Sequence, residues 1–132
     1  LRIISFKYFI LSSIATQVPQ AAGSGYAFRV NNEKKVAVVI WVKARQLGDF
    51  PVALNFAATL KCQTLFLCRN NKYAISTPTT DQYASDGIIP RAISMGIAST
   101  RVDGNDALVV YKLLEEQDNT FLNSKNHILL NS

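Results

Sequence analysis

Apolar residues fill positions 36–42 without interruption, and most of them are β-branched. Such a run is typical of a strand that is covered on both faces in a parallel sheet. Residues 50–60 place their apolar side chains at mostly helical spacing, with Pro51 suited to the first turn. Residues 63–68 form a second short apolar run. The pattern predicts a strand–helix–strand unit, whose connection favours a parallel pair of strands.

The alternation continues on both sides of this unit. Residues 15–30 are rich in alanine, with Gly23 and Gly25 where close helix packing favours small side chains. A short strand is expected at about residues 100–102 and, after a turn at 103–106, a helix over 107–116. We therefore predict an α/β fold with an open, mostly parallel sheet and helices on both faces.

The loops of such a sheet locate its ligand site. Ligands of open α/β sheets bind at the carboxyl ends of the strands, from which residues 43–48 and 69–80 emerge. Residues 70–90 are unusually polar and are expected to form one long loop. Loops of this length in small domains are often functional.

Composition and charge narrow the class of protein. The chain has 132 residues, of which 48% are hydrophobic and 17% charged, enough for one core and one domain. The net charge is +5, but the only adjacent basic residues are Lys34 and Lys35, so no nucleic-acid partner is expected. Residues 1–15 resemble a signal peptide, yet Lys7 interrupts their apolar run, which is too short to span a bilayer. No membrane partner is expected either.

The two cysteines, Cys62 and Cys68, are expected to be buried structural thiols. Their even separation places both on one face of a strand, too far apart for a disulfide. No neighbouring cluster of metal-ligating residues marks them as zinc ligands. Thiols of this kind are typical of a reducing compartment.

Four longer motifs carry a resemblance to a known family. They occupy residues 15–27 (ATQ, PQAAG and YA), 48–62 (GDF, ALNFAATL), 68–88 (CRNN, YAISTPT, QY and DGI) and 101–106 (RVDGND). Together they resemble the α subunit of thiamine-diphosphate-dependent 2-oxo acid dehydrogenases, and most of all the branched-chain (2-oxoisovalerate) enzyme. The resemblance covers residues 10–111 and implies that residues 1–132 are a fragment of the thiamine-diphosphate-binding domain.

The resemblance implies a Mg²⁺ ion that bridges the two phosphates of the cofactor and requires hard oxygen ligands. It assigns the Asn71 side chain and the Tyr73 backbone carbonyl to the metal, and Arg69 to the diphosphate oxygens. Taken alone, Asn70 and Asn71 are typical turn formers and Arg69 a surface cation.

A second ion, K⁺, is implied for the segment before residue 18. The family uses hydroxyl and carbonyl oxygens there, and the resemblance assigns Ser12, Thr16 and Gln17 to the metal and Ser13 to the cofactor. The proline that the family has in this segment is absent.

The pattern breaks at the family's first metal motif, Gly-Asp/Glu-Gly. The family's spacing from Asn71 places Trp41-Val42-Lys43 there, so no carboxylate is available at Val42. Lys43 and Ala44 remain candidates for contact with the cofactor. As written, the chain is expected to bind Mg²⁺ and cofactor poorly.

A frame slip in the gene would explain this break. Reading the codons one base earlier permits Gly-Glu-Gly at the motif, and permits family-like sequence within residues 112–119 and 125–131. Our hypothesis is a corrected slip between about residues 39 and 47 and an uncorrected one at 112, which makes residues 112–132 a slipped tail. On this view His127 and the pair Glu115–Glu116 are not catalytic, and no catalytic side chain is assigned.

The resemblance implies oxidative decarboxylation of branched-chain 2-oxo acids with acyl transfer to a lipoyl group. The implied partners are the β subunit, in a heterotetramer of two α and two β subunits, and a lipoyl-bearing acyltransferase. The α subunit of pyruvate dehydrogenase and a non-catalytic relative are the alternatives. The implied location is the mitochondrial matrix in a eukaryote and the cytoplasm otherwise.

Overall fold

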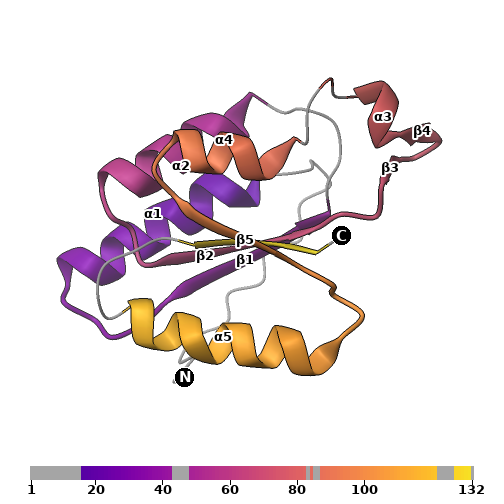
Figure 1. Cartoon of the computed structure of the whole chain (residues 1–132). Coiled ribbons are helices and arrows are strands. Elements are labelled where there is room, and N and C mark those ends of the chain that lie inside the picture. The colour runs from indigo at the N-terminus through magenta and orange to yellow at the C-terminus, as the bar shows by residue number, and fades with distance from the viewer. Residues whose placement is uncertain (1–15, 43–47, 83, 85–86, 122–126, 132) are drawn as a thin grey trace.

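A parallel sheet of four strands forms the centre of the molecule (Figure 1). The computed structural model describes residues 16–42, 48–82, 84, 87–121 and 127–131. In spatial order the strands are β1 (Ala37–Val42), β2 (Thr64–Arg69), β6 (His127–Asn131) and β5 (Ala98–Val102), and each neighbouring pair is parallel. The predicted parallel pair is thus β1 and β2.

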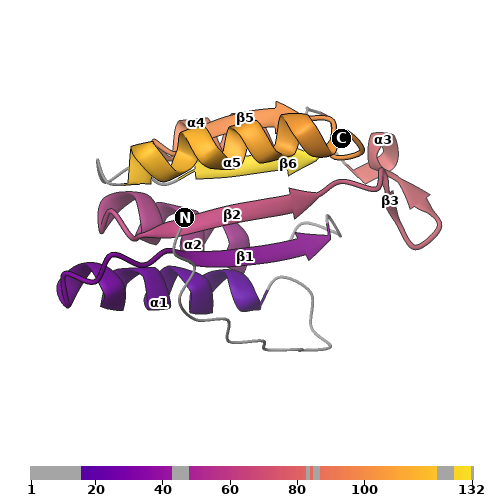
Figure 2. The same ribbon diagram turned by 90° about the horizontal axis from the view of Figure 1, so that it is seen from below.

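Helices cover both faces of this sheet, as the sequence predicts. Helices α1 (Gln17–Val30), α2 (Asp49–Thr59) and α4 (Ile88–Ser94) lie on one face, and α5 (Ala107–Phe121) lies on the other (Figures 1 and 2). The Asp106 carboxylate accepts hydrogen bonds from the backbone N–H groups of Leu108 and Val109 at 3.0 and 3.1 Å. This acceptor satisfies two donors of the first turn and fixes where α5 begins.

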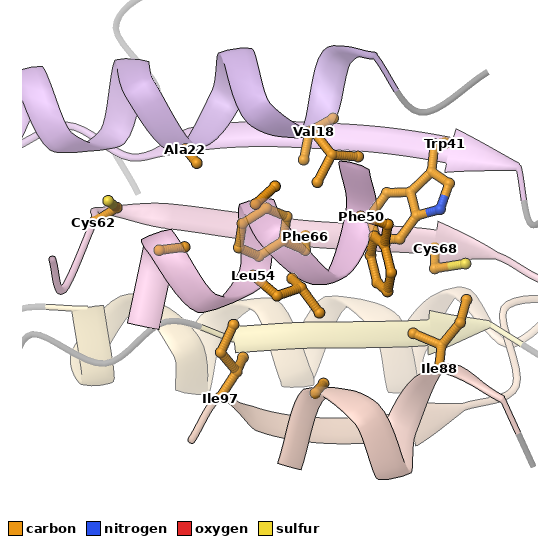
Figure 3. Close-up of a cluster of buried hydrophobic side chains, with 14 residues drawn as sticks. Val18, Ala22, Trp41, Phe50, Leu54, Cys62, Phe66, Cys68, Ile88 and Ile97 are labelled. Atoms are coloured by element: carbon orange, nitrogen blue, oxygen red, sulfur yellow. The ribbon is translucent and has the colours of Figure 1, made fainter. Parts of the chain in front are cut away.

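The main core lies between the sheet and the three helices of the first face (Figure 3). Phe66 of β2, Leu54 of α2 and Val18 of α1 are completely buried there. Trp41 of β1 is 8% exposed, and its ring centroid lies 5.4 Å from that of Phe50 and 6.5 Å from that of Phe66. Aromatic contacts at these distances are favourable, so Trp41 is a packing residue of the core.

The packing of α1 against β2 depends on a glycine. A Cβ atom at Gly25 would lie 2.1 Å from Thr64 Oγ1 and 2.8 Å from the Gln63 carbonyl oxygen, which confirms the predicted close approach. The prediction is wrong for Gly23, where a Cβ atom would meet nothing within 4 Å. Thr64 is completely buried, and its hydroxyl donates to the Ala21 carbonyl at 3.3 Å.

The second face of the sheet has a smaller core. Leu65 is buried against α5, together with the partly buried Val38, Leu67, Leu113 and Leu114. Further along β1 this cover ends, and Ile40 is 70% exposed. The prediction that residues 36–42 are covered on both faces is therefore wrong for the carboxyl half of the strand.

The prediction of one long loop at residues 70–90 is also wrong. This segment contains a hairpin of β3 (Tyr73–Ala74) and β4 (Thr77–Pro78), the short helix α3 (Thr79–Gln82) and the start of α4. The last helix continues beyond the predicted residue 116, and β6 forms an inner strand of the sheet. The frame-slip hypothesis concerns the gene and stays a prediction.

The two cysteines are buried thiols and are not joined in a disulfide, as predicted. Burial raises the pKa of the Cys62 thiol, and the positive charge of Arg29 opposes this shift. None of the described helices has the length and apolar character needed to cross a membrane.

Candidate functional site

The candidate site lies where β1 and β2 end. Val42 and Arg69, the last residues of the two strands, are register partners. Helix α1 runs antiparallel to β1, so its first residues lie toward the same edge of the sheet (Figure 2). The fold thus brings together the start of α1, which carries Thr16 and Gln17, and the two strand ends.

Val42 and Arg69 lie side by side on the α5 face. Side chains alternate along a strand, and Trp41 and Cys68 point into the helix-covered core on the opposite face. Val42 is 43% exposed, and Arg69 is exposed. A carboxylate at position 42 would therefore stand next to the Arg69 guanidinium, but the valine supplies only an aliphatic surface.

A pair of turns follows β2. The Asn70 side-chain oxygen accepts from the Lys72 N–H at 3.1 Å, and that of Asn71 accepts from the Tyr73 N–H at 3.2 Å. Lys72 has a φ of 64°, a left-handed conformation that such turns accommodate. The two asparagines thus act as turn formers. A carboxamide oxygen has two lone pairs, so Asn71 retains the capacity for one further ligand.

The hairpin of β3 and β4 presents the backbone of Tyr73. Its cross-strand partner is Pro78, which has no N–H to donate to the Tyr73 carbonyl. The Thr79 N–H donates to the Lys72 carbonyl at 2.9 Å, and the Gln82 side-chain amide donates to the Thr77 carbonyl at 2.7 Å. These bonds hold the hairpin beyond the carboxyl ends of the strands (Figure 1).

The donor set does not fit a Mg²⁺ ion. Mg²⁺ requires near-octahedral oxygen ligands and is usually bound through at least one carboxylate. The sequence has no Asp or Glu from residue 34 to residue 48, and the described residues contain no group of three potential metal-ligating acids, histidines or cysteines. What remains is one side-chain oxygen, of Asn71, and the Tyr73 carbonyl.

The other predicted site residues divide into two groups. Thr16 and Gln17 are half-buried at the start of α1, where the Thr16 hydroxyl does not cap the helix. Ser12, Ser13, Lys43 and Ala44 lie outside the described residues. The burial of Trp41 agrees with the prediction of a covered strand at residues 36–42, and Val39 and Trp41 are two residues apart, the spacing of one strand face.

Solved structures define the class of fold. An enzyme from Mycobacterium smegmatis that is described as thiamin diphosphate-dependent matches 90% of this chain with a TM-score of 0.64 and 23% identity. A transketolase mutant from Pichia stipitis matches 86% of it with a TM-score of 0.66 and 17% identity. The chain covers 22% and 18% of those chains, so its fold matches a part of each of theirs.

Sequence comparison identifies the family. The family model "Dehydrogenase E1 component" matches residues 7–131, and the chain belongs to this family. It is 50% identical over 109 residues to the mitochondrial 2-oxoisovalerate dehydrogenase subunit alpha of Caenorhabditis elegans and 49% identical over 108 residues to that of Homo sapiens. Each of these matches covers 81% of this chain.

The subunit alpha 2 of Arabidopsis thaliana is 41% identical over 126 residues, or 94% of this chain. The chain spans about a quarter of the length of these three relatives: 25%, 24% and 27%.

Proposed function

We propose that the chain is part of the α subunit of a branched-chain 2-oxo acid dehydrogenase. The observation that carries this proposal is the identity of 41–50% to three proteins named as 2-oxoisovalerate dehydrogenase α subunits. The whole enzyme would decarboxylate branched-chain 2-oxo acids oxidatively and transfer the acyl group to a lipoyl group. The relatives are named as mitochondrial, which supports a location in the mitochondrial matrix.

Within that enzyme, the chain would contribute one wall of the thiamine diphosphate site. Thiamine diphosphate, when bound, supplies the carbon centre at which 2-oxo acids are decarboxylated. The exposed guanidinium of Arg69 can pair with diphosphate oxygens. Asn71, in the turn after β2, and the Tyr73 carbonyl, in the hairpin that follows, would supply oxygen ligands close to Arg69 in the sequence. No residue of the chain is assigned to proton transfer.

The partners follow from the same proposal. A β subunit would complete the site in a heterotetramer of two α and two β subunits, and a lipoyl-bearing acyltransferase would take the product. The substrate is tested by assembling the full-length α subunit with its β subunit and comparing turnover of 2-oxoisovalerate and pyruvate. We expect a higher kcat/KM for 2-oxoisovalerate; a preference for pyruvate would assign the chain to pyruvate dehydrogenase instead.

A second candidate function is that of a non-catalytic relative that keeps the fold and its partner surfaces. It is favoured by Val42 at the strand end and by the integration of Trp41 into the core. The two candidates differ in cofactor binding. Titration of the full-length subunit with thiamine diphosphate and Mg²⁺ would give no Mg²⁺-dependent heat for the non-catalytic relative.

The frame-slip hypothesis would reconcile the two candidates, because it restores a carboxylate at the motif. Sequencing the locus tests it directly. A one-base shift on either side of the codons for residues 39–47 is expected. An uninterrupted frame that encodes Trp41-Val42-Lys43 would disprove it.

A further inference from the structure

The end of β2 and the turn after it carry two exposed cations. Arg69 is the last residue of the strand, and Lys72 follows three residues later. Within the described part of the chain, neither side chain takes part in an ion pair. Both positive charges can therefore meet an anionic ligand at the carboxyl end of the sheet, where ligands of open α/β sheets bind.

The backbone at Lys72 is strained. Its φ of 64° lies in the left-handed region, which glycine adopts readily and lysine only at a cost. The Lys72 N–H donates to the Asn70 side-chain oxygen at 3.1 Å, so the turn holds the backbone of Lys72 close to Asn70, the neighbour of Arg69. Strained backbone of this kind often marks a functional position.

The charges around this turn favour an anion over a metal ion. Between residue 34 and residue 80 the sequence has a single acid, Asp49, which begins α2. The register partner of Arg69 on β1 is Val42, and the oxygen ligands that remain do not suit Mg²⁺. A diphosphate group bound here has to be neutralised by cationic side chains instead.

We infer that Arg69 and Lys72 together bind a diphosphate group without a metal ion, and that Lys72 supplies positive charge that a Mg²⁺ ion would otherwise provide. The planar guanidinium of Arg69 can pair with two phosphate oxygens, and the ammonium of Lys72 acts as a point charge beside it. The ligand class is a diphosphate, free or as the ester in thiamine diphosphate. The inference rests on the proposed cofactor site and extends it to Lys72, a residue outside the predicted ligand set.

Calorimetric titration with inorganic diphosphate tests whether a metal ion is needed. The protein is the full-length subunit that carries Trp41-Val42-Lys43, measured at low salt with a chelator and then with Mg²⁺. We expect diphosphate to bind in the chelator and to bind no more tightly with Mg²⁺, because the metal neutralises the charge that the two side chains attract. No binding in the chelator, or tighter binding with Mg²⁺, would overturn the inference.

Two lysines in the same backbone conformation provide matched variants. Lys61 has a φ of 47° and is exposed like Lys72, but it precedes β2 and so lies at the opposite end of the strand. Lys72→Gly and Lys61→Gly each remove one charge and relieve one strained residue. We expect Lys72→Gly to weaken diphosphate binding about tenfold, typical of a lost charge-assisted contact, and Lys61→Gly to leave it unchanged. Equal affinities of the two variants would overturn the inference.

Titration with thiamine diphosphate separates this inference from the proposed function. Metal-free binding of inorganic diphosphate that depends on Lys72 supports the inference whichever 2-oxo acid the enzyme turns over. It supports the inference even where thiamine diphosphate binds no more tightly than inorganic diphosphate, a result that would count against the proposed cofactor site.

Discussion

The carboxyl ends of β1 and β2 lie at one edge of the sheet, but different interactions fix their conformations. The exit of β2 is a local structure, in which Asn70 and Asn71 each accept a hydrogen bond from a backbone N–H two residues later. The exit of β1 is fixed by tertiary packing, because Trp41 is held between Phe50 and Phe66. The conformation of a short turn depends mainly on its own residues. The side chains at the end of a buried strand must instead fit the core around them.

This difference separates the candidate site residues after β2 from those at the end of β1. The turn after β2 is held by its own residues, so the positions of Asn71 and Tyr73 are set locally. At the β1 exit the residue next to Arg69 is Val42, and nothing in the core requires a carboxylate there. The following predictions test this contrast, from the largest expected effect to the smallest.

Replacing the indole at the β1 exit will have the largest effect. Trp41→Gly removes a buried aromatic side chain and places glycine in a strand, which together cost about 3–5 kcal/mol of unfolding free energy. Denaturant unfolding of the full-length subunit measures this loss. Trp41→Phe is the control, since it keeps an aromatic ring against Phe50 and Phe66 and will lose less. Equal stabilities of Trp41→Gly and the parent would contradict the assignment of Trp41 to the core.

Adding a side chain at the close contact between α1 and the start of β2 will have the second-largest effect. Gly25→Ala forces a Cβ atom to within 2.1 Å of Thr64 Oγ1, and overpacking of this kind costs about 1–3 kcal/mol. Gly23→Ala is the matched control on the same helix. It adds a methyl group in open space and improves helix propensity, for a gain of about 0.5–1 kcal/mol. Thermal melts of both variants provide the measurement, and a destabilised Gly23→Ala beside an unaffected Gly25→Ala would refute the packing described.

Removing the turn acceptor after β2 will have a smaller and local effect. Asn71→Ala loses the hydrogen bond from the Tyr73 N–H, worth about 1 kcal/mol at an exposed site. Exchange of the Tyr73 amide is expected to accelerate while the amides of β2 remain protected. Asn71→Asp keeps the acceptor and will preserve the protection. If Asn71→Ala also accelerated exchange of the β2 amides, the turn after β2 would not be an independent local structure.

Breaking the surface ion pair of Glu33 and Lys35 will have the smallest effect. The hydrogen bond that Lys35 donates to the Glu33 carboxylate holds the pKa of Glu33 below its usual value of 4.5. Because the folded pKa is the lower one, the small stability that this pair adds is present above the unfolded pKa and is lost as the pH falls through the folded pKa. An NMR titration of the Glu33 carboxyl, with Lys35→Gln as the comparison, checks this shift. A pKa that does not change in Lys35→Gln would exclude the pair as its cause.

Much of the fold could be predicted from the sequence, because its elements carry strong patterns. The apolar runs of β1 and β2 and the helix between them are long enough to define a parallel unit. The two-residue strands β3 and β4 are too short to leave a periodic pattern, so their region was predicted as a loop. The exposure of Ile40 depends on where α5 lies, which no local pattern encodes.

The sequence likewise predicts only some features of the candidate site. The missing carboxylate at Val42 is visible in the sequence alone, and so are the turn-forming asparagines. The burial of Trp41 follows from the predicted covered strand, but an unbroken apolar run does not reveal which of its two faces packs more tightly. The proximity of Val42 to Arg69 follows only from the strand register.

The proposed cofactor site depends most on position 42, where the family motif would supply a carboxylate and this chain has Val42. The decisive measurement is calorimetric titration of thiamine diphosphate, with and without Mg²⁺, into full-length subunits that carry Val42→Glu or Ile40→Glu. Both substitutions add a carboxylate to an exposed position on the same face of β1, but only residue 42 neighbours Arg69 at the strand end.

We expect Mg²⁺ to tighten thiamine diphosphate binding by at least about tenfold more in Val42→Glu than in Ile40→Glu or the parent, since even outer-shell changes alter metal affinity by that factor. An equal Mg²⁺ effect in the parent, or in Ile40→Glu, would contradict the account.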